Sequence, residues 1–557
     1  RKVGMSWWSL VCWLSLWVCM ANAGGPVIQT ASGPIEGITR DGVDIFWGVP
    51  FAASPVGPLR FRAPQPAQPW TELRDCTKDA PKCPQWHIFG NYFTGQEDCL
   101  TLDVYVPSNR TNATLPVMVF IYGGGFVVGG SFQNGHYDGT KLAQRGVVVV
   151  CIQYRINVLG FLALEELRAE VSDGGTGNYG LQDQRLALQW VQHNIGFFSG
   201  NPSKVTIFGE SAGGVSVCAH LVSPASVGLF HAAIVESGIC DTTLFFAPVE
   251  GAMSFGANFS RHVGCTTPGP ERLECLRSLP LKDVLAYMLI PNITLPAPAP
   301  QDWMGLEAWT PLMIPAIAFV PAVDGAESGL MDFPVAMVRA GNFTRVPTIM
   351  GTNHDEGSVF APFSSLVAGH LPPLTQAKAE DVIRHLWAQD IVKEVQQMYP
   401  PASYKSPTAR IAAIMRAFMF TCPTRRFARA LSAGGAVTWL YNFNYTLRWI
   451  DTKIFGDYHT SELDFVFGTH SPMGLHKFNE DDQKIADYFQ GFWTSLAEVG
   501  APAAAAVWPP YLAATDLNLA LDIPLAVETG LLKHECDFWD RVPDIALPPH
   551  FVGSALA

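Results

Sequence analysis

The chain has 557 residues, of which 48% are hydrophobic and 15% are charged. This composition provides enough apolar surface for a large core and is too apolar for an intrinsically disordered protein. The formal net charge of −13 argues against nucleic acids and anionic membrane surfaces as partners, because both would repel an acidic protein.

The first residues indicate a targeting segment. Arg1 and Lys2 precede an apolar run over residues 7–20, and Ala-Asn-Ala follows at residues 21–23. A basic, an apolar and a small-residue region in this order are typical of a secretory signal peptide. The alternative, a signal anchor, is less favoured because the run is short for a membrane span. We expect residues 1–23 to be a signal peptide and the mature protein to be secreted and extracellular.

The remaining chain, residues 24–557, shows no linker, composition break or internal repeat, and we expect a single domain. Secretion would expose N-x-[ST] sequons to glycosylation. The sequons are Asn109, Asn112, Asn258, Asn292, Asn342 and Asn444.

Short apolar runs alternate with helical patterns along the first half of the chain. Strands are expected at residues 100–106, 116–122, 146–154 and 232–236, and an amphipathic helix at residues 181–194. The second strand is almost wholly apolar, which is typical of a central parallel strand covered on both faces. The alternation predicts an α/β fold with a doubly wound, mostly parallel sheet.

Residues 209–213 read Gly-Glu-Ser-Ala-Gly and fit the G-x-S-x-G pattern. The β-branched and aromatic residues 205–208 predict a buried strand before the motif, and residues 215–219 suit a buried helix after it. Such a sharp turn would hold Ser211 in a strained conformation, with the positive end of the helix directed at its hydroxyl. The pattern therefore predicts a nucleophilic serine, and a Gly/Ser turn without chemistry is the alternative.

Three glycines, residues 123–125, directly follow the apolar strand at residues 116–122. Backbone N–H groups in such a loop can converge on a small anion, as an oxyanion hole requires. The alternative is a flexible glycine turn.

A serine nucleophile needs a base, and the base needs a carboxylate that orients it. Asp355 and Glu356 lie in a loop that follows an apolar strand, and spacing does not choose between them. His459 lies in a loop before an apolar segment, and His470 and His476 are rivals on spacing alone. No C-x-x-C pattern or His cluster suggests a metal, and we expect no cofactor.

Taken together, these motifs resemble the type-B carboxylesterases, the family that includes the cholinesterases. The resemblance runs from about residue 33 to residue 539. It implies an α/β-hydrolase fold and a serine carboxylic ester hydrolase that acts on small-molecule esters through an acyl-enzyme intermediate. The segments that carry it are Val49–Ala52, Pro55–Phe61, Glu97–Leu100, Tyr122–Phe126, Gly180–Gln184, Gly209–Gly213, Asp355–Gly357, His459–Glu462 and Trp508–Tyr511.

The resemblance also implies the roles of individual residues. Ser211 would be the nucleophile, Glu356 the acid and His459 the base. The implied oxyanion donors are the backbone N–H groups of Gly124, Gly125 and Ala212. The substrate pocket would include Tyr122, Phe126, Glu210, Phe360 and Glu462. Tyr122 precedes the glycines where other esterases have His, and matches the cholinesterase variant of this loop.

Two structural ion pairs, Arg60–Glu97 and Arg155–Asp183, are implied in the same way. Ten of the twelve cysteines lie outside the expected signal peptide. The family's three disulfides map onto Cys83–Cys99, Cys265–Cys275 and Cys422–Cys536. Cys151, in an apolar strand, and Cys218, in the buried helix, are expected to be inert thiols, whereas Cys76 and Cys240 have no assigned role.

Two other functions compete with this interpretation. An adhesion or carrier domain of the same fold would lack an intact triad, and a lipase would require an amphipathic lid, which the sequence does not show. A cholinesterase needs an aromatic face for its cation, but the loop from Cys83 to Cys99 is short and its only tryptophan, Trp86, lies at the start. Phe89, Tyr92 and Phe93 occupy the rest of that loop, and Phe126, Phe245, Phe246, Phe360 and Phe363 would build an apolar gorge. We therefore expect neutral esters, with no nucleic acid as partner and no membrane insertion after signal cleavage.

Overall fold

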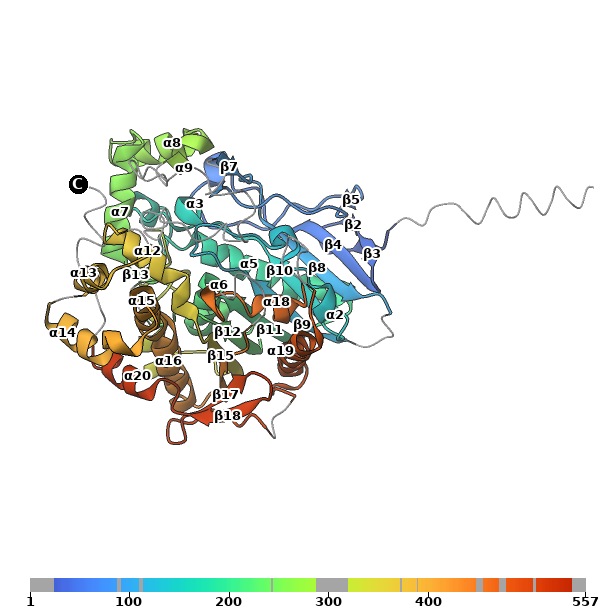
Figure 1. Ribbon diagram of the computed structural model, residues 1–557. Coiled ribbons are helices and arrows are strands. Elements are labelled where there is room, and N and C mark those ends of the chain that lie inside the picture. The colour runs from blue at the N-terminus through green and yellow to red at the C-terminus, as the bar shows by residue number, and fades with distance from the viewer. Residues whose placement is uncertain are drawn as a thin grey trace, which may run out of the picture.

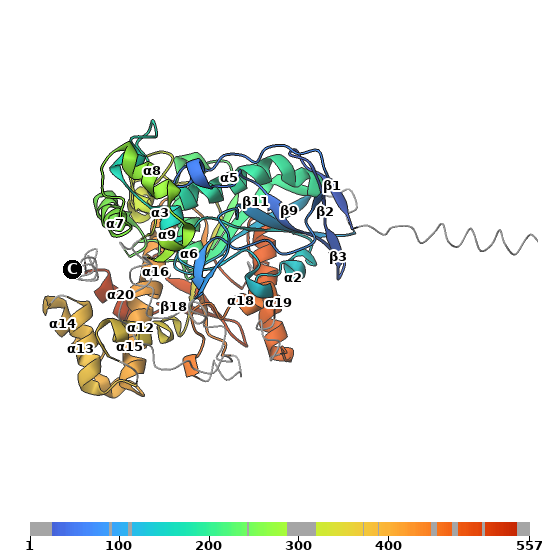
Figure 2. The ribbon, with the colours of Figure 1, turned by 90° about the horizontal axis from the view of Figure 1, so that it is seen from above.

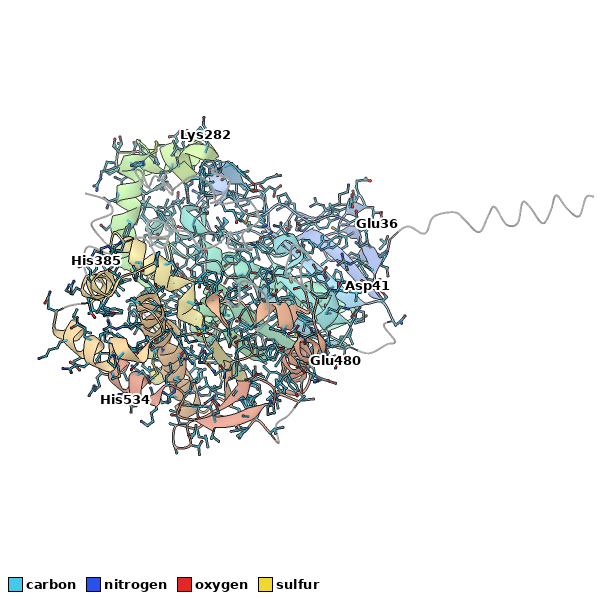
Figure 3. All side chains as sticks on the ribbon, in the orientation of Figure 1. Glu36, Asp41, Lys282, His385, Glu480 and His534 are labelled. Atoms are coloured by element: carbon cyan, nitrogen blue, oxygen red, sulfur yellow. A yellow bond between two sulfur atoms is a disulfide. The ribbon has the colours of Figure 1, made fainter. Side chains whose placement is uncertain are left out.

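The computed structural model describes residues 25–87, 92–109, 114–241, 244–286, 319–370, 373–387, 389–446, 454–469, 477–503 and 507–542. The expected signal peptide at residues 1–23 lies outside this part of the chain. Charged residues such as Asp41, Lys282 and Glu480 lie on the outside of the molecule (Figure 3). Among the described helices, none is long and apolar enough to cross a membrane.

An 11-stranded sheet runs through the middle of the molecule (Figure 1). Its strand order is β18-β17-β16-β15-β12-β11-β9-β10-β8-β4-β3. The strands are β3 (Ile38–Arg40), β4 (Val43–Pro50), β8 (Thr101–Pro107), β9 (Leu115–Ile121), β10 (Val148–Ile152), β11 (Gly200–Glu210), β12 (Ala232–Glu236), β15 (Thr348–Asn353), β16 (Thr438–Phe443), β17 (Leu517–Leu521) and β18 (Ala526–Thr529).

The strands from β17 to β10 pair in parallel, and antiparallel strands extend the sheet at both edges. Every residue of β10, β12, β15 and β16 is buried, because helices cover both faces. Helix α5 (Tyr179–Asn194) lies on one side of the sheet and α19 (Glu480–Val499) on the other (Figure 2). Helix α6 (Ala212–Val222) packs against β11, β12 and α5. The expected α/β, doubly wound, mostly parallel sheet is confirmed.

The carboxyl ends of the central strands lie at one edge of the sheet. Ile121 of β9 pairs with Gly209 of β11, and Glu210 pairs with Glu236 of β12. Glu236 in turn pairs with Gly351 of β15. The loops that follow these strands therefore emerge side by side, which is where open α/β sheets bind their ligands.

Two further groups of helices lie beyond those that cover the central strands (Figure 1). Helices α7 (Val249–His262), α8 (Pro270–Ser278) and α9 (Leu281–Ala286) follow β12. Helices α12 (Phe360–Val367), α13 (Gln376–Leu386), α14 (Gln389–Met398), α15 (Pro407–Met415) and α16 (Cys422–Ala433) lie between β15 and β16 in the chain. The C-terminal helix α20 (Lys533–Trp539) lies beside this second group.

Both implied ion pairs are present. Arg60 and Glu97 form two parallel hydrogen bonds of 2.7 Å. Asp183 is fully buried and accepts the backbone N–H of Arg155 and two of its guanidinium hydrogens, at 2.7–3.0 Å. Such bidentate geometry offsets part of the cost of burying two charges.

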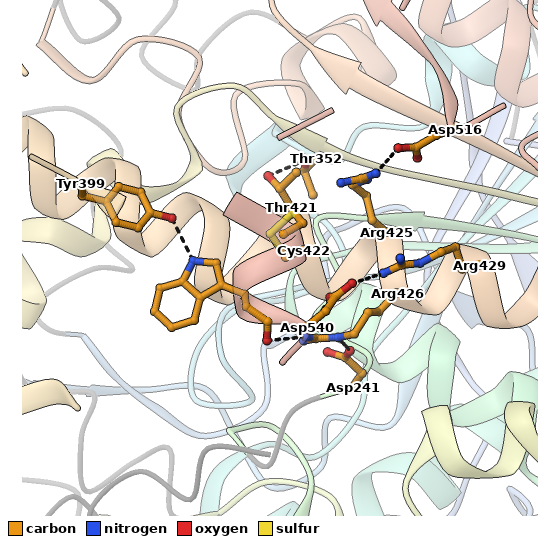
Figure 4. The surroundings of a disulfide bond; sticks show 12 residues. Asp241, Thr352, Tyr399, Thr421, Cys422, Arg425, Arg426, Arg429, Asp516 and Asp540 are labelled. Atoms are coloured by element: carbon orange, nitrogen blue, oxygen red, sulfur yellow. Dashed lines mark hydrogen bonds and ion pairs between the residues drawn. A yellow bond between two sulfur atoms is a disulfide. The ribbon is translucent and has the colours of Figure 1, made fainter. Parts of the chain in front are cut away.

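The structure joins Cys83 to Cys99, Cys265 to Cys275 and Cys422 to Cys536, the three pairs that the resemblance implies. The last of these links α16 to α20. Ion pairs surround it, among them Arg426–Asp540, Arg429–Asp540 and Arg425–Asp516 (Figure 4).

The expectation that Cys218 is an inert thiol is wrong, because Cys218 forms a fourth disulfide with Cys240. The apolar surroundings of Cys218 predicted burial correctly, but they carry no information about what lies beside the helix. Cys151 and Cys76 are buried and unpaired. Burial raises the pKa of the Cys76 thiol to about 12 and that of Cys151 well above its ordinary value, so both are poor nucleophiles.

The glycosylation sequons occupy different positions. Asn109 and Asn342 are exposed, whereas Asn258 and Asn444 are half-buried. Asn112 and Asn292 lie outside the described residues. Among the four described sequons, exposure makes Asn109 and Asn342 the most accessible to a glycosyltransferase.

The two disulfides that close the longest and shortest loops allow a test of chain entropy. Cys422–Cys536 spans 114 residues and Cys265–Cys275 spans 10. We expect Cys422→Ala/Cys536→Ala to lower the free energy of unfolding by about 4–5 kcal/mol and Cys265→Ala/Cys275→Ala by about 2–3 kcal/mol. Urea denaturation measures both, and equal or reversed losses would contradict the ranking.

Candidate active site

Ser211 occupies the turn between β11 and α6. Its backbone has φ 56° and ψ −123°, a conformation that L-residues other than glycine rarely adopt and that costs about 1–3 kcal/mol. Its N–H donates to the carbonyl of Glu236 on the neighbouring strand at 2.9 Å. The strained turn is therefore held from the side by β12.

The glycines of the motif are required by close packing. A Cβ on Gly209 would lie 2.6 Å from the carbonyl oxygen of Ile121, and one on Gly213 only 1.9 Å from the same oxygen. Any side chain at either position would push β11 and α6 away from β9. The motif thus lets strand and helix pass so closely that Ser211 stands at the apex.

His459 is fully buried, and its two ring nitrogens have different neighbours. Nδ1 lies 2.6 Å from Oε2 of Glu356, and Nε2 lies 3.1 Å from Oε1 of Glu210. Glu210 immediately precedes Ser211, so Nε2 contacts the side chain of the residue before the serine. The rings of Phe360 and Phe420 pack against the imidazole, with centroids 5.2 and 4.7 Å away, and fix its plane.

The geometry distinguishes the two acids that the sequence leaves open. Glu356 is fully buried, and its Oε1 accepts from the hydroxyl of Ser237 at 2.5 Å and the N–H of Asn353 at 2.8 Å. With His459 on Oε2, the carboxylate has three hydrogen bonds. It is Glu356 that contacts the imidazole. The rival bases His470 and His476 lie outside the described residues.

Asp355 belongs to a separate group on the same two loops. One of its oxygens lies 3.2 Å from Nδ1 of His354, and the other accepts the N–H of Asp457 at 3.2 Å. Among the described residues, His354, Asp355 and Asp457 are the one group with donors close enough together for a metal ion. The contacts already made by Asp355 account for the group as a tie between the loops of Glu356 and His459.

The glycine loop after β9 lies against the serine turn. Gly124 and Gly125 have φ of 106° and 63°, and a Cβ on Gly123 would lie 3.0 Å from Cβ of Ser211. The carbonyl of Phe126 accepts the N–H of Asn157 at 2.6 Å. These contacts fix the loop beside the N-terminus of α6.

Tyr122, which directly follows β9, anchors this loop through its side chain. Its hydroxyl donates to the carbonyl of Tyr154 at 2.9 Å, the hydroxyl of Tyr154 donates to the carbonyl of Tyr122 at 2.7 Å, and the two rings stack. Both side chains are fully buried. The polar end of Tyr122 is therefore already used, and its place in the substrate pocket stays a prediction.

Four glutamates with at most 1% exposure lie in this part of the molecule: Glu210 and Glu356, which contact the imidazole, and Glu236 and Glu462, which interact electrostatically with Glu210. Burial raises the pKa of Glu210 and of Glu462 well above the ordinary value, and the neighbouring carboxylates add to both shifts. Burial raises the pKa of Glu236 to about 8, although a hydrogen bond from Trp493 acts in the opposite direction. Burial therefore favours the protonated forms of Glu210, Glu236 and Glu462.

Several supporting residues were not found from the sequence. Ser237 holds Glu356, and Phe420 packs on His459. The side chain of Asn353 donates to the carbonyl of Tyr458 at 2.9 Å and to Oε2 of Glu462. Ser237 and Asn353 could have been found because they lie at the carboxyl ends of β12 and β15. The sequence around Phe420 contains no comparable signal.

The chain matches the family model described as "Carboxylesterase family" over residues 24–539. It is 33% identical to Carboxylesterase 1D of Mus musculus over 90% of each chain. It is 32% identical to acetylcholinesterase of Danio rerio, over 94% of this chain and 89% of that protein. Among solved structures it is similar to a PNB esterase, with a TM-score of 0.73 and 31% identity over 92% of this chain and 99% of that one.

These similarities cover nearly the whole chain, and they agree with a serine turn, a glycine loop and a buried Glu–His pair at one edge of an α/β sheet. The chain belongs to the carboxylesterase family and is a carboxylic ester hydrolase with the α/β-hydrolase fold.

Proposed function

We propose that the enzyme hydrolyses esters through a triad of Ser211, His459 and Glu356 and an acyl-enzyme intermediate. The observation that carries this proposal is the 2.6 Å contact between Glu356 and Nδ1 of His459. The other ring nitrogen, Nε2, lies 3.1 Å from the side chain of Glu210, the residue before Ser211, which supports a role of His459 as the general base of Ser211. An adhesion or carrier domain would have no need for such a buried pair.

In the proposed reaction, the Oγ of Ser211 bonds to the ester carbonyl carbon while Nε2 of His459 takes the hydroxyl proton. Collapse of the tetrahedral intermediate breaks the bond to the alcohol, which leaves with that proton. Water then repeats both steps and releases the acid. Glu356 fixes the imidazole tautomer and stabilises the imidazolium.

The oxyanion of each tetrahedral intermediate would be held by the N–H groups of Gly124, Gly125 and Ala212. Ala212 is the first residue of α6, and the N–H groups of a first helical turn have no partner within the helix. The positive φ values of Gly124 and Gly125 turn the loop beside that helix terminus. Donors arranged in this way stabilise charge that develops only in the transition state.

For the substrate, we propose neutral carboxylic esters. Phe126, beside the oxyanion loop, packs its ring 5.0 Å from that of Phe161 and 6.3 Å from that of Phe245. Trp86 lies in the strand β6 (Gln85–His87) next to Cys83, and its ring contacts Phe93 at 4.2 Å. In the described part of this wall, Trp86 and Phe93 pack on each other, and such an apolar wall suits uncharged groups. Phe89 and the side chain of Phe363 lie outside the described residues.

Secretion is proposed as well. The four disulfides of the described residues are typical of a protein made in an oxidising compartment. A signal peptide at residues 1–23 and use of the exposed sequons Asn109 and Asn342 would accord with this location.

Replacing the nucleophile or the acid should abolish most turnover. We expect Ser211→Ala to lower kcat by about 10⁴-fold or more and Glu356→Gln to be severely impaired, because the tautomer is no longer fixed. Asp355→Asn is the matched control and should keep most activity. Hydrolysis of a p-nitrophenyl ester measures all three, and a dead Asp355→Asn variant would show that the acid is misassigned.

Discrimination between charged and neutral substrates tests the proposed specificity. We expect kcat/KM for a thiocholine ester to be no greater than that for an uncharged thioester of the same acyl length. A tenfold preference for the choline substrate corresponds to about 1.4 kcal/mol of additional transition-state binding. Such a preference would refute the neutral-ester assignment.

The raised pKa of Glu236 predicts how stability depends on pH. Its pKa is about 8 in the folded protein and 4.5 ordinarily, so the folded form binds the proton more tightly. The resulting stability is complete below pH 4.5 and is lost as pH rises towards 8. The variant Glu236→Gln keeps an acceptor for Trp493 but removes the titrating group. We expect its melting temperature to fall less than that of wild type as the pH rises from 5 to 8. The exposed Glu498→Gln is the control, and a wild-type-like pH dependence in Glu236→Gln would count against the buried-acid explanation.

A further inference from the structure

The disulfide Cys218–Cys240 joins two elements of the active site. Cys218 lies on α6 about two turns after Ser211, and Cys240 lies three residues after Ser237. Both cysteines are fully buried. This bond is not among the three that the resemblance implies, and it links the helix of the nucleophile to the segment that holds the acid.

Two further contacts connect the same helix and segment. The N–H of Ser211 donates to the carbonyl of Glu236 at 2.9 Å. A Cβ on Gly238 would lie 2.8 Å from the carbonyl carbon of Gly214, and one on Gly214 would lie 2.9 Å from Cα of Gly238. Residues 236–240 therefore run along α6 in backbone contact, and the disulfide closes the far end of this contact.

The segment between these ties carries strain. Ser237 has φ 50°, which a residue other than glycine adopts only when its surroundings impose it. Its N–H donates to the carbonyl of Gly351 at 2.9 Å, and its hydroxyl donates to Glu356. Keeping Ser237 in this conformation is what directs its hydroxyl at the acid.

Beyond Cys240 the segment is fastened again. Asp241 pairs with Arg426 of α16, and Arg426 also donates to the carbonyl of Trp539 at 3.1 Å and to Asp540 at 3.2 Å (Figure 4). These contacts hold the outer end of the segment to the helices α16 and α20. The disulfide ties Cys240, the residue before Asp241, covalently to α6.

We propose that Cys218–Cys240 is a positioning crosslink, which keeps Ser237 in its strained conformation and thereby orients Glu356 and His459 relative to Ser211. The proposal rests on the proposed triad. Neither cysteine touches the reacting atoms, so the crosslink acts through Ser237. Without it, residues 237–240 can relax, and the acid loses one of its three hydrogen bonds.

The test is the variant Cys218→Ala/Cys240→Ala, with Cys265→Ala/Cys275→Ala as a matched control. Hydrolysis of a p-nitrophenyl ester gives kcat and KM, and the rate of labelling by a fluorophosphonate reports the reactivity of Ser211. Both are normalised to folded protein. We expect kcat and the labelling rate of the test variant to fall about tenfold, with KM within twofold of wild type, because substrate contacts are unchanged. The control should stay within twofold in every parameter.

A purely stabilising disulfide would lower the melting temperature and leave the normalised kcat and labelling rate within twofold of wild type, and this result overturns the proposal. If the double variant does not fold, Cys240→Ala takes its place, because it keeps the sulfur of Cys218 inside the helix packing and leaves a smaller cavity. The same losses are expected of it, and wild-type rates overturn the proposal equally. If the wild-type enzyme neither hydrolyses esters nor reacts with the fluorophosphonate, the triad itself is overturned. If the wild type is active and the variant is unchanged, only the crosslink proposal is overturned.

Discussion

The hydrogen bond between Glu356 and Nδ1 of His459 is the interaction on which the site depends. It joins two loops that lie 103 residues apart in the chain, and both groups are fully buried. A buried carboxylate is tolerated only when its oxygens are satisfied. Ser237 and Asn353 supply the remaining donors, so the ends of β12 and β15 hold the Glu356–His459 pair as much as the loops do.

The same burial has an electrostatic consequence. Glu210, Glu236 and Glu462 lie close to Glu356, and four ionised carboxylates could not share one low-dielectric pocket with a single imidazole. Burial raises the pKa of Glu210, Glu236 and Glu462, which favours their uncharged forms. The three raised pKa values reduce the repulsion that these side chains would otherwise exert on Glu356, the acid that contacts His459.

The sheet and the serine turn could be predicted from the sequence because their signals are local. The strand predicted at residues 232–236 has the same bounds as β12. The strand predicted at residues 205–208 lies inside the longer β11. The choice between Asp355 and Glu356 could not be made from spacing, because adjacent residues differ only in which way the turn after β15 points them. Phe420 and Ser237 were missed for a related reason: each acts through a neighbour that is distant in sequence.

Cys218 shows most clearly what local patterns cannot supply. Its apolar neighbours predicted a buried position, and it is buried, but the partner that changes its chemistry lies on the segment after β12, 22 residues away. That segment approaches α6 only because Gly214 and Gly238 lack side chains and let the two backbones touch. The disulfide is therefore a product of the tertiary packing. The same packing that holds Ser211 and Ser237 at positive φ also brings Cys218 and Cys240 within bonding distance, so the crosslink forms beside the serine turn and the residue that donates to Glu356.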